Sequence, residues 1–416
     1  MKNKQKPEIM APVGSFAALQ AAIASGADSV FFGVKQLNMR ARSSYNFELD
    51  EIQVVADRCH KAKVRSYITL NTLLYEHDMA LMKKIITTAK EAGIDEIIVQ
   101  DMAAIQFAKE IGMPIQASTQ LSISNYESVK FYSQFANTIV LAREVDLDMM
   151  KVICDRIREE DLRGSSGKPL KIEVFVHGAL CIAQSGRCQM SLLTSNTSAQ
   201  RGACLQECRK KYMIKDEETG NEMSVRGGYV MSPKDLCCLP FLDKIVETGV
   251  SVIKIEGRGR SPEYVKTVIK VYREAVDAIH ENAFTPAKVN TWLKELEKVY
   301  NRGFCSGYYL GKLLPDWSLC SGNKSTEERV YVGRVSHYFP KAQVAELSTD
   351  ALEIKTGDKL VIMGDNTGVV RTDVTSIKLD DKFVDSSGKQ NLVTIPLEKR
   401  VRKNDKIYLL RKRQNV

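Results

Sequence analysis

Short apolar, β-branched runs alternate with stretches of helical periodicity along the first three quarters of the chain. The apolar runs do not alternate cleanly with polar residues, which is typical of strands buried on both faces of a parallel sheet. Eight strands are predicted: Glu8–Pro12, Ser29–Gly33, Arg65–Asn71, Glu96–Asp101, Pro114–Thr119, Thr138–Arg143, Ile172–Gly178 and Ser251–Gly257. Helical periodicity marks the segments between them, as in Phe16–Ser25 and Met79–Ala92. Together they predict an α/β fold, a (β/α)8 TIM-like barrel, with an open doubly wound sheet as the alternative.

The connection between the last two predicted strands is abnormally long. It covers residues 179–250 and contains six of the ten cysteines of the chain. In a (β/α) barrel, a segment that follows a strand projects from the face where active sites are built. We therefore expect a catalytic barrel domain over residues 1–320, with a cysteine-rich insertion at its mouth.

The pattern changes near Arg329, where short strand-like runs begin and turn residues such as Gly364-Asp365-Asn366 separate them. Such runs predict a small β-barrel domain over residues 327–416. The chain ends in the basic sequence LLRKRQNV. This end is either a solvated tail or a contact to RNA phosphate.

The composition, with 44% hydrophobic and 27% charged residues, is that of a soluble globular protein. The sequence shows neither a signal peptide nor an apolar run long enough to cross a membrane, so we expect a cytoplasmic protein without a membrane partner. In that reducing compartment, clustered cysteines indicate metal or redox chemistry rather than disulfides. The formal net charge of +9 suits a polyanionic partner such as RNA.

Polar residues end six of the eight predicted strands and, in a barrel, would meet at its mouth. Some of them could instead cap the helices that follow. Arginine and lysine at these ends suit a small molecule that carries carboxylates. The predicted substrate-binding residues are Asn71, Gln116, Arg143, Lys254 and Arg258. His177 and Glu256 are the candidates for moving protons, and hence the predicted catalytic residues.

Four cysteines of the insertion, Cys181, Cys188, Cys204 and Cys208, are spaced C-x6-C-x15-C-x3-C. Four soft thiolates suit zinc or an iron–sulfur cluster. Zinc sites usually contain paired knuckles, and only the last two cysteines form such a pair. The spacing leaves three readings open, namely a cluster, zinc or reduced structural thiols. Cys237 could also replace Cys208 as the fourth ligand.

A nucleophilic Cys–His pair is a further alternative, because His177 and Cys181 lie four residues apart. The imidazole would have to face the sulfur, and a corner between a strand and an insertion does not ensure that. The sequence contains neither a G-x-S-x-G elbow nor an H-E-x-x-H motif. Proteolysis therefore receives little support from the residues themselves.

Several blocks of the sequence resemble the collagenase-like peptidase family U32. EVFVHGALCIAQSGRCQMS resembles the family signature, and RGACLQECRKKY, SPKDLC, IKIEGRGRSPEYV and NRGFCSGYYLG resemble its other blocks. The opening EIMAPVGSFAALQAAIASGADSVFFG is also similar, so the resemblance covers essentially the whole chain.

The resemblance implies an activity other than the one in the family's name. Several of its members are hydroxylases that act without molecular oxygen on tRNA, on ribosomal RNA or in ubiquinone synthesis. In these members a [4Fe–4S] cluster, supplied by iron–sulfur assembly machinery, is bound by cysteines that match Cys181, Cys188 and Cys204. Cys208 matches the fourth ligand of the RNA-modifying branch, whereas one ubiquinone-pathway member uses a later cysteine, which keeps Cys237 open.

The appended β domain is most similar to that of the tRNA-modifying branch. That similarity implies hydroxylation of the wobble uridine of tRNA to 5-hydroxyuridine, with the dicarboxylate prephenate as a required metabolite. A collagenase-like peptidase and a non-catalytic iron–sulfur protein that binds RNA remain the alternatives.

Overall fold

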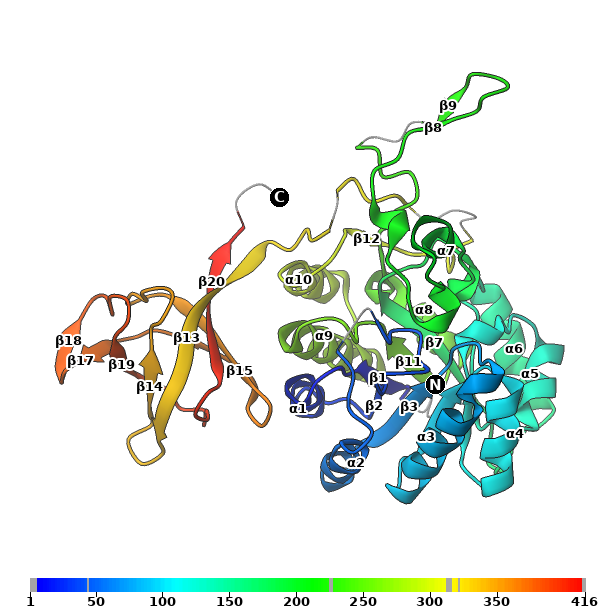
Figure 1. Cartoon of the computed structure of the whole chain (residues 1–416), viewed down its shortest axis with the longest axis horizontal. Coiled ribbons are helices and arrows are strands. Elements are labelled where there is room, and N and C mark those ends of the chain that lie inside the picture. Colours follow the sequence, from blue (N-terminus) through cyan, green and yellow to red (C-terminus); the bar gives the residue numbers. More distant parts are fainter. Residues whose placement is uncertain (1–5, 43–44, 224–226, 312–315, 321, 414–416) are drawn as a thin grey trace.

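The computed structural model describes residues 6–42, 45–223, 227–311, 316–320 and 322–413. Eight parallel strands form a closed barrel (Figure 1). They are β1 (Glu8–Pro12), β2 (Ser29–Phe32), β3 (Arg65–Leu70), β4 (Glu96–Val99), β5 (Ile115–Ala117), β6 (Thr138–Val140), β7 (Lys171–Gly178) and β11 (Val252–Ile255). The strands pair in sequence order, and β11 pairs with both β7 and β1. This closure confirms the predicted barrel and excludes an open sheet.

Helices cover the outside of the barrel (Figure 1). They are α1 (Phe16–Ala24), α2 (Ile52–Lys61), α3 (Met79–Glu91), α4 (Met102–Ile111), α5 (Tyr126–Ser133), α6 (Leu147–Glu159), α8 (Leu242–Thr248), α9 (Pro262–His280) and α10 (Pro286–Glu297). Several begin at a side chain that accepts a hydrogen bond from the first turn, such as Ser15, Asp101 and Ser261. The main hydrophobic core lies between these helices and the outward faces of the strands.

The barrel interior contains an apolar layer and, around it, buried polar groups. Met10, Phe31 and Tyr67 belong to the apolar layer. Lys254 on β11 and Glu173 on β7 form an ion pair at 2.8 Å, and both side chains are almost completely buried. Polar groups placed this deep need partners, because an unpaired buried charge is strongly destabilising.

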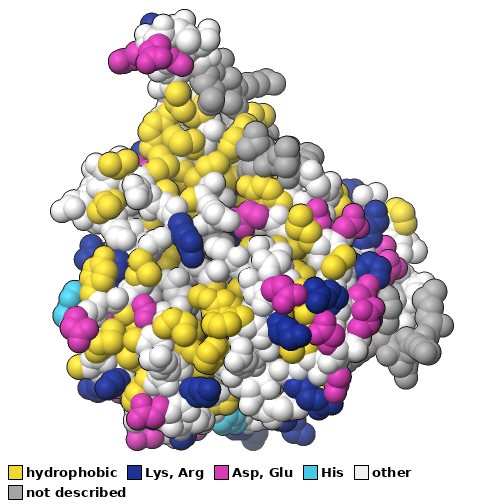
Figure 2. Space-filling model, turned by 90° about the vertical axis from the view of Figure 1, so that its right-hand side faces the viewer, with side chains coloured by type: hydrophobic (Ala, Val, Ile, Leu, Met, Phe, Trp, Pro, Cys, Tyr) yellow, Lys and Arg dark blue, Asp and Glu magenta, His cyan; other side chains and the backbone are white. Residues whose placement is uncertain are grey.

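The long connection between β7 and α8 forms the predicted insertion. It contains α7 (Met190–Ser195), a hairpin of β8 (Ile214–Lys215) and β9 (Glu222–Met223), and β10 (Asp235–Cys237), which pairs with β7 and with β12 (Phe304–Cys305). Short 3-10 turns are η1 (Glu76–Asp78), η2 (Thr119–Leu121), η3 (Gln184–Gly186), η4 (Ala199–Arg201), η5 (Glu207–Arg209) and η6 (Leu239–Phe241). The hairpin projects away from the barrel, and hydrophobic side chains gather below it (Figures 1 and 2).

The C-terminal part is an eight-stranded antiparallel sheet around a hydrophobic core of its own. The strands lie in the order β16-β15-β20-β13-β14-β19-β17-β18. Their bounds are β13 (Glu327–Phe339), β14 (Val344–Ser348), β15 (Lys359–Gly364), β16 (Gly368–Asp373), β17 (Ile377–Leu379), β18 (Lys382–Val384), β19 (Leu392–Pro396) and β20 (Lys406–Lys412). This confirms the predicted all-β region, and we retain as a proposal that it is a separate domain from residue 327 onward.

The C-terminal sheet packs beside α1 and α9 of the barrel (Figure 1). Ala21 of α1 lies against Val361 and Val369 of the sheet. The Lys266 ammonium of α9 donates to the Val369 carbonyl at 2.8 Å.

The basic end of the chain is predicted to be either a solvated tail or a contact to RNA phosphate. The structure places its first four residues, 409–412, in β20. Residues 414–416 lie outside the described residues. Within the described part of the chain, no helix is long and apolar enough to cross a membrane.

Candidate active site

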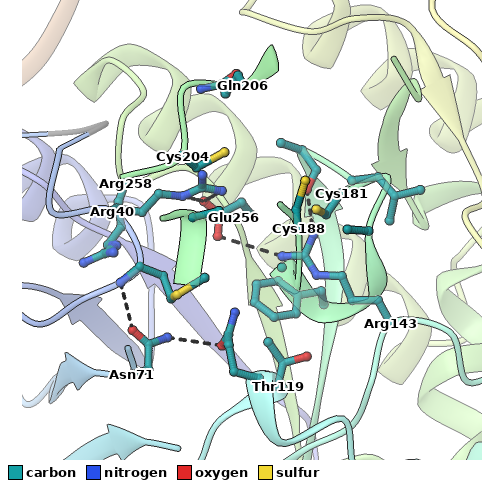
Figure 3. Close-up of a pocket in the computed structure, with 18 of the residues that line it drawn as sticks. Arg40, Asn71, Thr119, Arg143, Cys181, Cys188, Cys204, Gln206, Glu256 and Arg258 are labelled. Carbon is teal, nitrogen blue, oxygen red and sulfur yellow. Dashed lines mark hydrogen bonds and ion pairs between the residues drawn. The ribbon is translucent and has the colours of Figure 1, made fainter. Parts of the chain in front are cut away.

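A cavity of about 200 Å³ lies at the mouth of the barrel, between the strand ends and the insertion (Figure 3). Four of the five predicted substrate-binding residues line it, together with predicted Glu256 and all four cysteines of the C-x6-C-x15-C-x3-C pattern. These residues are Asn71, Arg143, Lys254, Arg258, Glu256, Cys181, Cys188, Cys204 and Cys208. The fold therefore brings two motifs that are separate in the sequence to one place.

The four cysteines are partly exposed free thiols. Burial raises the pKa of Cys208 to about 11, and it also raises the pKa of Cys188, with the neighbouring thiols adding to both shifts. The backbone N–H of Met190 donates to Sγ of Cys188 at 3.4 Å. The guanidinium of Arg209 offsets part of the rise in the pKa of Cys208, and a bound metal would favour the thiolate form of both cysteines.

Two guanidinium groups lie near these sulfurs. Arg40 is close enough to interact electrostatically with Cys181 and Cys204, and Arg209 with Cys181 and Cys208. They would balance part of the negative charge of four thiolates. Among the described residues, no group of three or more Cys, His, Asp or Glu is placed to hold a metal ion.

Cys237, the other candidate for a fourth ligand, is only 3% exposed and does not line the cavity. The Tyr272 hydroxyl lies 4.0 Å from its sulfur. Burial raises the pKa of Cys237 to about 12. Of the two candidates, Cys208 shares the cavity with the other three cysteines.

Glu256 connects two arginines in the cavity wall. Its carboxylate lies 3.1 Å from Nη2 of Arg40 and 4.0 Å from Nη2 of Arg143 (Figure 3). Burial alone would raise the pKa of Glu256, but Arg40, Arg143 and Arg258 outweigh it and hold the pKa below its ordinary value. The backbone of Glu256 packs closely against Gly178 at the end of β7. A side chain at position 178 would clash with the Glu256 carbonyl. Glu256 is therefore an ionised anchor for guanidinium groups.

Arg143 and Arg258 are held in different ways. Nη1 of Arg143 donates to the Ala179 carbonyl at 2.6 Å, and its guanidinium lies 4.0 Å from the centre of the Phe175 ring. Arg258 is buried and donates to Thr69 and Asn38 at 2.9 and 2.8 Å. Burial lowers the pKa of Arg258 to about 10. Since Arg258 already has two side-chain partners, Arg143 is the better placed of the two to bind a ligand.

Arg40 lines the cavity and pairs with Glu256, but the sequence did not predict it as a site residue. It lies in the loop that follows β2, and loops after barrel strands form the active face. Arg40 lies eight residues after the end of β2, whereas the predicted site residues lie at the ends of the predicted strands.

The sequence model of peptidase family U32 matches residues 14–318. The chain belongs to peptidase family U32.

Relatives of this U32 protein have names of two kinds. A collagenase of Porphyromonas gingivalis is 44% identical over 98% of both chains. A tRNA hydroxylation protein of Bacillus subtilis is 29% identical, covering 86% of this chain and 84% of the relative. A 23S ribosomal RNA 5-hydroxycytidine synthase of Escherichia coli is 30% identical, covering 88% of this chain and 53% of the relative. The solved U32 peptidase Mk0906 aligns with 62% of this chain and 95% of its own at 10% identity, with a TM-score of 0.39.

Two predicted site residues of the U32 protein lie outside the cavity. Gln116 is fully buried in β5, one layer below the mouth, because β5 ends only at Ala117. His177 is 2% exposed and packs against Tyr264, Tyr272 and Phe304. The register between β7 and β11 shifts after Lys254, which turns His177 toward α9 instead of the mouth. The expectation that these two side chains reach the cavity is therefore wrong.

His177 should be visible in the pH dependence of stability. Burial lowers its pKa from 6.5 to about 3, so the folded protein keeps it neutral while the unfolded chain protonates it below about 6.5. Stability should therefore fall as the pH decreases, by about 1.4 kcal/mol per unit between these two values. We expect His177→Gln to remove this part of the pH dependence in urea unfolding measured at several pH values. An equally steep acid loss in the variant would contradict the assignment.

Proposed function

We propose that this U32 protein is a tRNA-modifying hydroxylase that forms 5-hydroxyuridine at the wobble position without molecular oxygen. The observation that carries the proposal is the shared cavity, which is lined by four cysteine thiols together with Arg143 and the ionised Glu256. The names of the relatives that hydroxylate tRNA and ribosomal RNA support the same reaction class.

In this proposal Cys181, Cys188, Cys204 and Cys208 bind a [4Fe–4S] cluster. The fit rests on four sulfur donors that line one cavity, on the N–H of Met190 directed at Cys188, and on the positive charge of Arg40 and Arg209. A cluster bound there would supply one-electron transfer at the cavity wall. Positive groups and N–H donors around the sulfurs stabilise the thiolate form of the ligands.

The target uridine would enter the cavity unstacked, since bases in RNA loops can splay into protein pockets. Replacing C5–H by C5–OH with the oxygen of water releases two protons and two electrons, so an external electron acceptor is required. Prephenate would be bound through its carboxylates. Arg143 is the primary candidate for that contact, because Lys254 and Arg258 are already paired with Glu173 and with Thr69 and Asn38. Asn71 lines the same cavity.

Glu256 would act in this site as a positioning residue. A carboxylate whose pKa is held low is a weak base, which disfavours proton abstraction from the substrate. Its interactions with Arg40 and Arg143 instead fix both guanidinium groups toward the cavity.

A collagenase-like peptidase is the second candidate, favoured by the 44% identity to a protein of that name. A thiol peptidase needs an imidazole beside its nucleophile. Of the described residues that line the cavity, none is a histidine, and His177 is buried behind the wall. The site geometry therefore supports the hydroxylase better.

The proposed function predicts a gain of modified nucleoside. Expression of the wild-type protein in a bacterial host that lacks wobble 5-hydroxyuridine derivatives should produce them in total tRNA, measured by nucleoside mass spectrometry. Cys204→Ala, expressed at the same level, should produce none. The wild-type protein could instead contain iron and bind RNA but leave the tRNA unmodified. That result would favour a non-catalytic RNA-binding protein. Hydrolysis of gelatin that is lost in Cys181→Ala would favour the peptidase.

A further inference from the structure

A second hollow lies between the barrel and the C-terminal sheet. It has a volume of about 420 Å³ and is lined by residues of the β11–α9 loop, the end of α10 and the strands β13 and β20. Gly259 and Arg260 line both this hollow, here called the interdomain cleft, and the candidate active site. The two hollows therefore meet at the loop that precedes α9.

Cations from four separate segments line the interdomain cleft: Arg260, Lys298, Arg329 and Arg413. The guanidinium of Arg260 stacks on the Tyr300 ring at 3.5 Å, which fixes it at the junction with the active site. Two of these cations already have a carboxylate partner: Lys298 lies 2.5 Å from Glu295, and Arg329 pairs with Glu263. Arg329 and Arg371 pair with Glu263 at 3.2 and 2.7 Å, so its charge is already neutralised.

Two polar atoms of residues that line the cleft are buried and lack a hydrogen-bond partner within the described part of the chain. They are Nε of Arg413, a donor, and Oε2 of Glu327, an acceptor. Glu327 is the first residue of β13, and Arg413 follows the last residue of β20 and donates its backbone N–H to the Thr326 carbonyl at 2.9 Å. Buried polar groups in native proteins almost always have partners, so a donor and an acceptor left open in one cleft indicate a ligand that supplies both.

We propose that the interdomain cleft binds the ribose–phosphate backbone of the RNA strand that adjoins the nucleoside in the active site. Phosphate oxygens accept from Arg413 and Arg260, and a ribose 2′-hydroxyl donates to Glu327. This combination fits RNA better than DNA, because only RNA carries the 2′-hydroxyl. The inference rests on the proposed function in that RNA is the substrate, but it assigns a binding site that does not depend on which base is hydroxylated.

The cleft also explains how one strand can reach both hollows. Backbone contacts fix the position of a strand, while the reacting base is recognised elsewhere. Arg260 at the junction would hold the phosphate beside the flipped nucleoside, and the cleft would hold the phosphates that follow.

Binding of a fluorescent oligouridylate and its deoxy counterpart to the full-length protein, measured by anisotropy, tests the assignment. We expect the wild type to prefer the RNA and to lose affinity with rising salt. Arg413→Gln should weaken both ligands several-fold and reduce the slope of log affinity against log salt by about 0.7, the value for one phosphate contact to a single strand. Glu327→Ala removes the acceptor of the 2′-hydroxyl, so it should reduce the ratio of the affinity for RNA to the affinity for the deoxy strand.

Lys378→Gln is the matched control, because Lys378 lies exposed on β17 away from the cleft. It should bind both strands as the wild type does. Wild-type affinity and salt slope in a folded Arg413→Gln, or no binding of RNA by the wild type, would overturn the proposal. The cleft variants could weaken RNA binding while the wild-type protein gives no hydroxylation in the nucleoside assay. That result would refute the proposed function and still support RNA binding in the interdomain cleft.

Discussion

Replacing Cys208 by serine is expected to abolish cluster binding, whereas replacing Cys237 by serine is expected to preserve it. Cys208 lines the cavity with the other three thiols, and Cys237 is buried behind the wall beside Tyr272. An iron ligand must reach the cluster, so position in the cavity decides between the two cysteines. Anaerobically purified Cys208→Ser should lose the visible iron–sulfur absorption and its iron, with formation of 5-hydroxyuridine below detection.

The pair of variants is its own control. Circular dichroism should show that both are folded, and Cys237→Ser should keep iron content and activity near the wild type. Loss of iron in Cys237→Ser together with retention in Cys208→Ser would reverse the assignment. One zinc per chain and no iron in the wild-type protein would contradict the cluster itself.

Lys254→Met is expected to cause the largest loss of stability among the variants considered. The Lys254–Glu173 pair is the most completely buried ion pair in the described part of the chain, with side-chain exposures of 4% and 0%. Removing the lysine leaves Glu173 either charged without a partner or forced to take up a proton. Breaking such a pair by removing one partner costs about 3–5 kcal/mol. Urea unfolding, monitored by a spectroscopic signal that reports on the barrel, should show this decrease in the free energy of unfolding.

The double variant Lys254→Met/Glu173→Gln tests the cause. Removing both charges should recover much of the loss, because no unpaired ion remains in the barrel. Lys35→Met removes one partner of an exposed pair with Glu48 and should leave the unfolding midpoint unchanged. A double variant that is less stable than Lys254→Met would show that packing, rather than the unpaired charge, dominates.

The strands of the barrel could be predicted well because they are buried on both faces. All eight predicted runs contain the observed strands, or nearly so, since only β7 begins one residue earlier, at Lys171. The predicted ends were too long at Thr119 and Gly257, where residues already belong to the loops of the mouth. Apolar patterning reports burial, and burial continues slightly beyond the last ladder hydrogen bond.

The site could be predicted only in part. Asn71 and Glu256 directly follow strands and Arg143 lies three residues after β6, so their presence at the mouth follows from the topology alone. The sequence did not predict Arg40 as a site residue, because Arg40 lies within the loop after β2 and reaches Glu256 only through the fold of that loop. Gln116 and His177 were misplaced because side-chain direction depends on strand length and on a register shift that the sequence does not display.

The sequence by itself determined the positions of the barrel strands, the all-β C-terminal region and the set of cysteines, since these depend on local patterns and spacing. Only the tertiary structure decided that the sheet closes, that Cys208 rather than Cys237 shares the cavity, and that Arg260 joins two hollows. These features depend on contacts between residues far apart in the chain. Local patterns fix which residues form a strand or a turn, but long-range packing fixes which side chains face one another.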